Sequence, residues 1–274
     1  MIFCATMPRA YKTARLRFGR AIAHGEQLAK MWNGLPDTFL CIPKAHLYAD
    51  GTGAIIAEKV GSLPDEFSLL LGEQLYQLRA ALDACIYQAT VYATGQNPPP
   101  DEGKLEFPIT WDRAEWPGLV KRRLSALPVV VQGGIEAVQP FKSLGLSPED
   151  QVISMGRSIG ILHDLARKDR HRQVHLVGSW PLEVKPAFDL PDGVRVDQVE
   201  TMPPSILVEG SVIVRFHLRG FVSGMPIRVN PQMQTNIGCN EPPVPCHSSD
   251  TFANRLTEMI NAVGSIILAF EHKF

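Results

Sequence analysis

The chain has 274 residues, of which 45% are hydrophobic and 20% are charged, and its 27 Lys and Arg nearly balance its 28 Asp and Glu. This composition is typical of a soluble globular protein, and it excludes global disorder, a collagen-like repeat and a coiled-coil rod. The net charge of −1 excludes a surface that is basic all over, so a nucleic-acid partner would have to bind a local basic patch.

Targeting signals and cysteines indicate the compartment. Residues 1–20 lack an apolar run followed by a small-residue cleavage site, so we expect no signal peptide. No run reaches the roughly 18 apolar residues of a membrane span, so we expect no contact with a membrane. The five scattered cysteines favour free thiols in a cytoplasmic protein. Cys239, Cys246 and His247 lack the spacing of a zinc site, and we predict neither a metal nor a cofactor.

The N-terminal half is predicted to be mainly helical. Apolar residues at helical spacing predict a helix over 11–32, and the Ser-Leu-Pro-Asp sequence at 62–65 begins a long helix that runs to about 93. Between them, an Asp-Gly pair joins two strand-like runs, 38–48 and 53–60, and predicts a small hairpin. Three shorter elements are expected to follow: a strand at 104–110, a helix at 111–127 that Pro117 breaks, and a brief helix at 133–138.

In the C-terminal half the pattern changes from helix to strand. A Ser-Pro-Glu-Asp start at 147–150 predicts a helix to about residue 170, and the tail at 250–270 returns to helical spacing. The strands expected between these helices are 173–177, 182–188, 194–199, 206–209 and 212–218.

These elements predict an α+β fold, in which a bundle of long helices accompanies a segregated antiparallel sheet and the small N-terminal hairpin. We expect residues 1–274 to form a single compact domain. Its helical part would cover about 11–170 and 250–272, and its sheet-rich part about 173–230.

Two of the predicted helices carry polar residues that a plain helical bundle does not require. Tyr76, Arg79 and Asp83 are spaced by 3 and 4 residues, so they share one face of the first helix. The other helix ends in a segment dense in cations and histidines, and its candidate site residues are Arg167, Asp169, Arg170, His171, Arg172 and His175. A second basic stretch lies at residues 9–20.

Three of these segments resemble parts of known proteins. LRAALD at 78–83, FPI at 107–109 and DRHR at 169–172 are similar to "LRxALD", "FPI" and "DKHR"-like segments of a widespread group of uncharacterised bacterial proteins. That resemblance spans most of the chain and implies no established activity. A more distant resemblance is to HEPN-type helical ribonucleases, because Arg170 and His175 match their R-x4-H spacing. It implies a homodimer whose paired motifs cut RNA without a metal.

Under the ribonuclease hypothesis Arg170, His171 and His175 are the catalytic residues. A histidine near neutral pKa can move the proton of a ribose 2′-hydroxyl, and an arginine can stabilise the charge that develops on phosphate. The supporting or binding residues would be Tyr76, Arg79, Asp83, Arg167, Asp169 and Arg172. Two alternatives stay open: a non-enzymatic binding or scaffold protein in which this cluster is a structural ion network, and a small-molecule phosphate or nucleotide binder.

Overall fold

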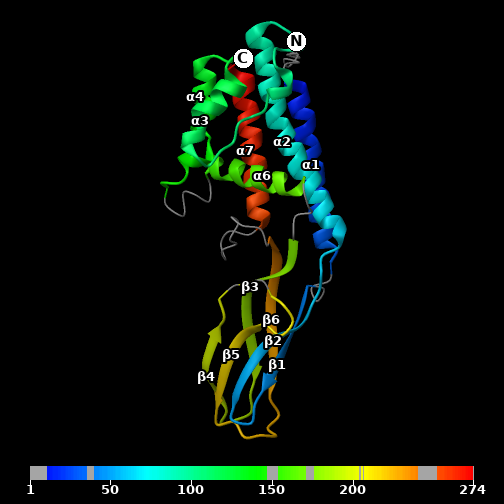
Figure 1. Cartoon of the computed structure of the whole chain (residues 1–274). Helices are drawn as coiled ribbons and strands as arrows, with labels where there is room; N and C mark the ends of the chain where they lie inside the picture. Colours follow the sequence, from blue (N-terminus) through cyan, green and yellow to red (C-terminus); the bar gives the residue numbers. More distant parts are fainter. Residues whose placement is uncertain are drawn as a thin grey trace, which may run out of the picture. The chain divides into compact units, whose positions relative to one another are not determined.

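The computed structural model describes residues 11–35, 40–146, 154–170, 176–203, 205, 207–239 and 252–273 (Figure 1). Contacts divide the chain into two compact units. The helical unit comprises residues 1–30, 68–174 and 254–274, and the sheet unit comprises residues 31–67 and 175–253. The α+β class is therefore confirmed, with helices and antiparallel strands in separate parts of the chain.

Long helices dominate the described part of the helical unit: α1 (Lys12–Asn33), α2 (Asp65–Thr94), α6 (Met155–Asp169) and α7 (Phe252–Lys273). Three of the predicted helices, at 11–32, 62–93 and 250–270, are confirmed by α1, α2 and α7. The helix predicted over 147–170 is confirmed only from Met155, because Ser154 is its non-helical N-cap and residues 147–153 lie outside the described residues. In Figure 1, α6 lies across the direction of α2 and α7.

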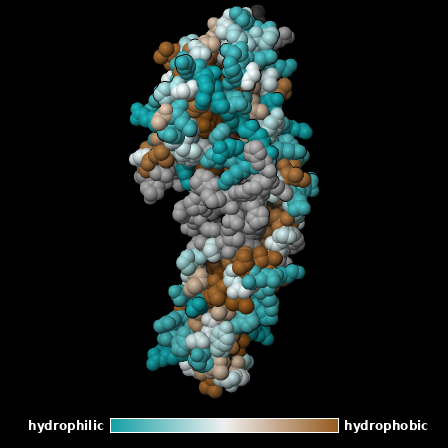
Figure 2. Space-filling model, in the orientation of Figure 1, coloured by the Kyte–Doolittle hydropathy of each residue, from teal (hydrophilic) through white to brown (hydrophobic). Residues whose placement is uncertain are grey.

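The core of the helical unit follows one apolar stripe of α2. Leu71, Leu75, Leu78 and Leu82 recur at helical spacing and have no exposed surface. Helices α1 and α7 lie against each other, since Arg15 forms an ion pair with Glu271. Hydrophilic side chains cover much of the helical unit on the face that Figure 2 shows, with scattered hydrophobic ones between them. None of the helices in the described part of the chain has the length and apolar character of a membrane span.

The connection from α2 to α6 differs from the prediction. It contains the short elements η2 (Glu102–Lys104), η3 (Arg113–Glu115), α3 (Trp116–Leu119), η4 (Val120–Leu124), α4 (Val129–Ala137) and η5 (Pro140–Lys142). The break predicted at Pro117 is wrong, because this proline lies in the first turn of α3, where its missing N–H is not needed. The strand predicted at 104–110 is also wrong, since Lys104 ends η2 and residues 105–110 pair with none of the described strands.

The sheet unit contains a four-stranded antiparallel sheet in the order β1-β2-β5-β4 and a two-stranded sheet, β3-β6. Their bounds are β1 (Cys41–Leu47), β2 (Thr52–Val60), β3 (Leu176–Asp189), β4 (Arg195–Thr201), β5 (Val212–Arg219) and β6 (Arg228–Cys239). The predicted N-terminal hairpin is β1-β2. It is an integral part of the larger sheet, because β2 pairs with β5, where Ile55 lies opposite Val214.

Three strand predictions need correction. The described residues of the strands predicted at 173–177 and 182–188 belong to one strand, β3, which begins at Leu176, and residues 173–175 lie outside the described residues. The register shifts of β3 accommodate Pro181. The strand predicted at 206–209 is wrong, since Leu207 and Val208 are irregular and a turn follows. Strand β6 was not predicted, because Pro231 and alternating polar residues conceal its strand pattern.

One face of the four-stranded sheet is covered by the two-stranded sheet. Ile55, Val214 and Phe216 belong to the buried core, and partly buried residues of β3 and β6 pack against it. The rings of Phe188 and Phe216 meet edge to face, with their centroids 5.2 Å apart. The side chains that alternate with this core therefore project from the opposite face of the sheet.

Candidate functional site

A cleft of about 270 Å³ in the helical unit contains most of the predicted site residues that the structure describes. It lies between α2 and the end of α6. The predicted residues that line it are Tyr76, Arg79, Asp83, Asp169 and Arg170. Arg167 is exposed on α6 and is not part of the lining. The remaining predicted residues, His171, Arg172 and His175, lie outside the described residues.

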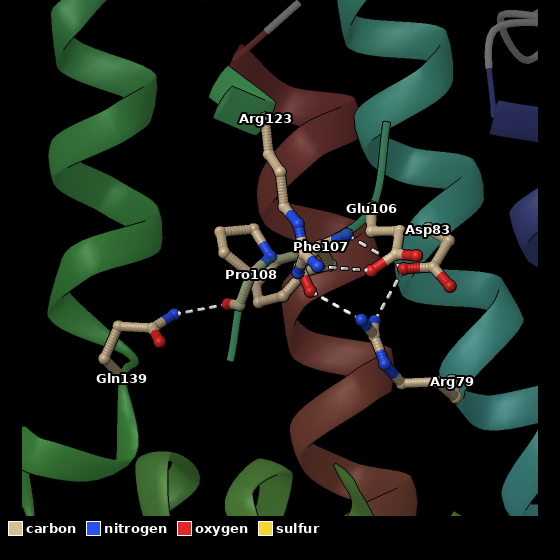
Figure 3. Close-up of polar contacts among 7 residues, drawn as sticks. All are labelled: Arg79, Asp83, Glu106, Phe107, Pro108, Arg123 and Gln139. Carbon is tan, nitrogen blue, oxygen red and sulfur yellow. Dashed lines mark hydrogen bonds and ion pairs between the residues drawn. The ribbon is translucent and has the colours of Figure 1, made fainter. Parts of the chain in front are cut away.

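Arg79 and Asp83 form a closed network with the backbone of Phe107 (Figure 3). Nη1 of Arg79 donates to Oδ1 of Asp83 over 2.6 Å, and Nη2 donates to the carbonyl oxygen of Phe107 over 2.6 Å. The same Asp83 oxygen accepts the backbone N–H of Phe107 over 2.8 Å. Phe107 thus donates its backbone N–H to the Asp83 carboxylate and accepts a hydrogen bond from the Arg79 guanidinium at its carbonyl oxygen.

Both charged side chains of this network are largely removed from solvent, so each depends on the other for its electrostatic stabilisation. The Arg79 side chain is 8% exposed and that of Asp83 is 33% exposed. Burial lowers the pKa of the Arg79 guanidinium, and the charge of Asp83 opposes this shift. Burial likewise raises the pKa of the Asp83 carboxyl, and Arg79 acts in the opposite direction. Each charge therefore compensates the cost of burying the other.

The extended segment that contains Phe107 is held from its other side by Gln139, which is fully buried. Nε2 of Gln139 donates to the carbonyl oxygen of Pro108 over 2.8 Å, and its Oε1 accepts the N–H of Thr110 over 3.1 Å (Figure 3). Side chains thus satisfy backbone groups that a sheet would otherwise pair. This explains why an extended segment at 105–110 is not part of a sheet.

Glu106, which also lines the cleft, was not predicted as a site residue. Its Oε2 lies 2.9 Å from Nη2 of Arg123, a residue of η4 (Figure 3). No periodic pattern connects these two positions in the sequence, because they meet only once the chain folds back after α2. This ion pair neutralises one of the carboxylates at the cleft.

His163 is a second lining residue that was not predicted. Its Nδ1 is buried and has no hydrogen-bond partner among the described residues. Burial, with Arg79, Arg167 and Arg170 nearby, lowers the pKa of His163 to about 4. It is therefore a neutral imidazole at pH 7. One signal was available in the sequence: His163 precedes Arg170 by seven residues, which is two helical turns.

Tyr76 and Arg170 lie at the accessible edge of the cleft. The Tyr76 residue is 54% exposed, and the guanidinium of Arg17 lies 5.9 Å from the centroid of its ring. Arg17 belongs to the basic stretch of α1. Arg170, the C-cap residue of α6, is exposed. Each predicted basic stretch thus contributes one cation here. Arg17 lies over the Tyr76 ring, and Arg170 lines the same cleft as Tyr76.

The cleft depends on a close approach of α2 and α6 at Gly72. A Cβ atom at this position would overlap the carboxylate of Asp169, so only glycine allows that carboxylate to lie against α2. Glu73, which follows on α2, places Oε2 3.4 Å from Nδ1 of His24. The cleft therefore combines carboxylates of two helices with the guanidinium of Arg170.

Among the residues that the structure describes, no three His, Cys, Asp or Glu side chains are grouped so as to hold a metal ion. No protein-family model, curated protein or solved structure matches this chain.

Proposed function

We propose that this protein is a non-enzymatic binding protein, in which Arg79 and Asp83 belong to the scaffold and the cleft between α2 and α6 is the ligand site. One observation carries the proposal: Nη1 and Nη2 of Arg79 and Oδ1 of Asp83 are bonded to each other and to Phe107. A catalytic or anion-binding guanidinium has to direct its donors at the ligand. Those of Arg79 are directed at the protein instead.

The charges at the cleft favour a small zwitterion, such as an amino acid. Asp83 and Glu106 are compensated by Arg79 and Arg123. Arg170 can bind a ligand carboxylate through two parallel hydrogen bonds. The carboxylate of Glu73, whose side chain is 60% exposed and lines the same cleft, can receive an ammonium group. The volume of about 270 Å³ is at the small end of ligand sites.

A thermal-shift screen tests this proposal. We expect the free amino acids to raise the unfolding temperature, since a ligand at 100 times its Kd stabilises by about 2.7 kcal/mol. Arg170→Gln should abolish the shift. Arg122→Gln, at an exposed position of η4 outside the cleft, should preserve it. Nucleotides and polyamines serve as ligands of one charge sign. If no zwitterion shifts the transition, or if Arg170→Gln leaves the shift intact, the proposal is wrong.

RNA cleavage or binding of the HEPN-like type is the second candidate, and the exposure of Arg170 at the cleft supports it. Arg170 follows the last residue of α6, whereas the family's motif lies on a helix. In this proposal a cytoplasmic homodimer cuts RNA without a metal. Single-stranded RNA and tRNA should be cleaved in the presence of EDTA, and His175→Ala should abolish cleavage. RNA that stays intact at micromolar protein would exclude this activity.

A further inference from the structure

The face of the four-stranded sheet opposite the two-stranded sheet contains a second hollow, which no motif of the sequence indicated. Its volume is about 510 Å³, and residues of β2, β4 and β5 line it together with Tyr48, which follows β1. The hollow lies wholly within the sheet unit. It is separate from the cleft of the helical unit, so the inference drawn from it does not depend on the proposed function.

Strand register places two rows of polar residues across this hollow. In the first row, Arg215 of β5 lies opposite Ala54 of β2 and Glu200 of β4. In the second row, His217 lies opposite Thr52 and Gln198. Arg215 is exposed, whereas its neighbours Val214 and Phe216 belong to the core. The small Ala54 side chain leaves space beside the long side chains of the first row.

An aromatic ring stands at the end of these rows. The Tyr48 residue is 57% exposed, and its backbone N–H donates to the carbonyl oxygen of Thr52 over 2.8 Å. Thr52 is fixed in turn, because its N–H and hydroxyl both donate to Oδ1 of Asp50. The ring therefore projects from a hydrogen-bonded turn at a defined place beside the sheet. An exposed aromatic ring gives a ligand an apolar surface at little conformational cost.

The charges of this face oppose each other. Arg215 and Glu200 are cross-strand partners, and Nδ1 of His217 lies 3.2 Å from Oδ2 of Asp197. A polyanion would meet the two carboxylates, and a polycation would meet the guanidinium. The groups that remain useful to a neutral ligand are planar donors and acceptors: guanidinium, imidazole, carboxylate and amide.

We propose that this face binds neutral carbohydrate. The Tyr48 ring packs against the C–H face of a sugar ring, and Arg215 donates hydrogen bonds to its hydroxyl oxygens. Nδ1 of His217 faces the Asp197 carboxylate, so its Nε2 accepts a hydrogen bond from a sugar hydroxyl. Glu200 and Gln198 accept hydrogen bonds from neighbouring hydroxyls. A sugar is the ligand class that presents both an apolar ring face and a ring of hydroxyl donors and acceptors.

Affinity electrophoresis of the full chain tests the proposal. Native gels contain one soluble neutral polysaccharide each: a β-glucan, an α-glucan, a mannan, a xylan or a galactan. We expect at least one of them to retard the protein, and Tyr48→Ala to weaken that retardation about tenfold. Tyr76→Ala is the matched control, because Tyr76 is a similarly exposed tyrosine (54% against 57%) in the helical unit. Circular dichroism checks that both variants are folded.

The outcomes separate this proposal from the proposed function of the cleft. Arg170→Gln should leave polysaccharide binding unchanged, whereas Glu200→Ala should weaken it several-fold. Absence of retardation by every polysaccharide overturns the proposal, as does equal loss in Tyr48→Ala and Tyr76→Ala. Retardation only by a sulfated or carboxylated polysaccharide would also overturn it, because the charge argument would then be wrong.

Discussion

Removing the two members of the Arg79–Asp83 pair should have unequal costs. Asp83→Leu leaves a guanidinium that is 8% exposed without a compensating charge and with only the carbonyl oxygen of Phe107 as its acceptor, and we expect it to lower the free energy of unfolding by about 3–5 kcal/mol. Arg79→Met leaves a carboxylate that is 33% exposed and still accepts the N–H of Phe107, so water can replace part of the lost interaction. We expect a smaller loss there, of about 2–3 kcal/mol.

The double variant, Arg79→Met with Asp83→Leu, isolates the coupling between the two side chains. Neither charge is then left alone in the interior, so its cost should be at least about 2 kcal/mol less than the sum of the single costs. Urea unfolding followed by far-UV circular dichroism measures all three. Lys104→Met is the control, because Lys104 pairs with Asp101 over 2.9 Å on the surface and should contribute less than about 1 kcal/mol. Additive single costs, each below about 1 kcal/mol, would refute the structural role.

Two further predictions concern other residues of the cleft. The pKa of His163 is about 4 in the folded chain and roughly 6.5 when unfolded, so the unfolded state binds more protons between these values. The free energy of unfolding should therefore fall by up to about 3 kcal/mol as the pH falls from 6.5 to 4. Chemical unfolding at each pH measures this loss. It should persist in His272→Gln, an exposed control, and be absent in His163→Gln. Gly72→Ala should destabilise the protein by about 1–2 kcal/mol, because its Cβ overlaps Asp169. Gly19→Ala has nothing within 4 Å of its Cβ and should stabilise the protein by roughly 0.5–1 kcal/mol. Thermal unfolding measures both variants, and a change of the same sign in both would contradict this reasoning.

Local signals predicted the elements whose stabilisation is local. The long helices α1, α2 and α7 combine an apolar stripe with clear boundaries, and the Asp50-Gly51 turn defines the β1-β2 hairpin. Pairings between strands that lie far apart in the sequence were not predicted, even where the strands themselves were. The pairing of β2 with β5 joins positions about 160 residues apart, such as Ile55 and Val214, and no local pattern specifies it. Strand β6 was not predicted for the same reason. Its pairing with β3 stabilises a strand in a sequence whose polar residues and proline do not favour one.

The candidate site was predictable where its residues share a helix face. Tyr76, Arg79 and Asp83 were identified by spacing alone, and Asp169 and Arg170 by the density of charge at the end of α6. The backbone of Phe107, the principal partner of Arg79 and Asp83, could not be identified in this way. Backbone groups carry no sequence signal, and the two hydrogen bonds of Phe107 reach residues 24 and 28 positions earlier in the chain.

The LRAALD segment at 78–83 and the FPI segment at 107–109 therefore form one structural unit rather than two independent motifs. Leu78 and Leu82 place one face of α2 in the core, and this orients Arg79 and Asp83 toward the backbone of Phe107. The Phe107 ring is fully buried and lines an apolar cavity of about 280 Å³ beside α4 and α7. The backbone of Phe107 holds the polar network and its ring is buried in the core. A change in the network should therefore also alter the packing of the helical unit. Under the proposed function, a ligand would therefore bind the side chains outside this network, and Arg170 and Glu73 are exposed at the edge of the cleft.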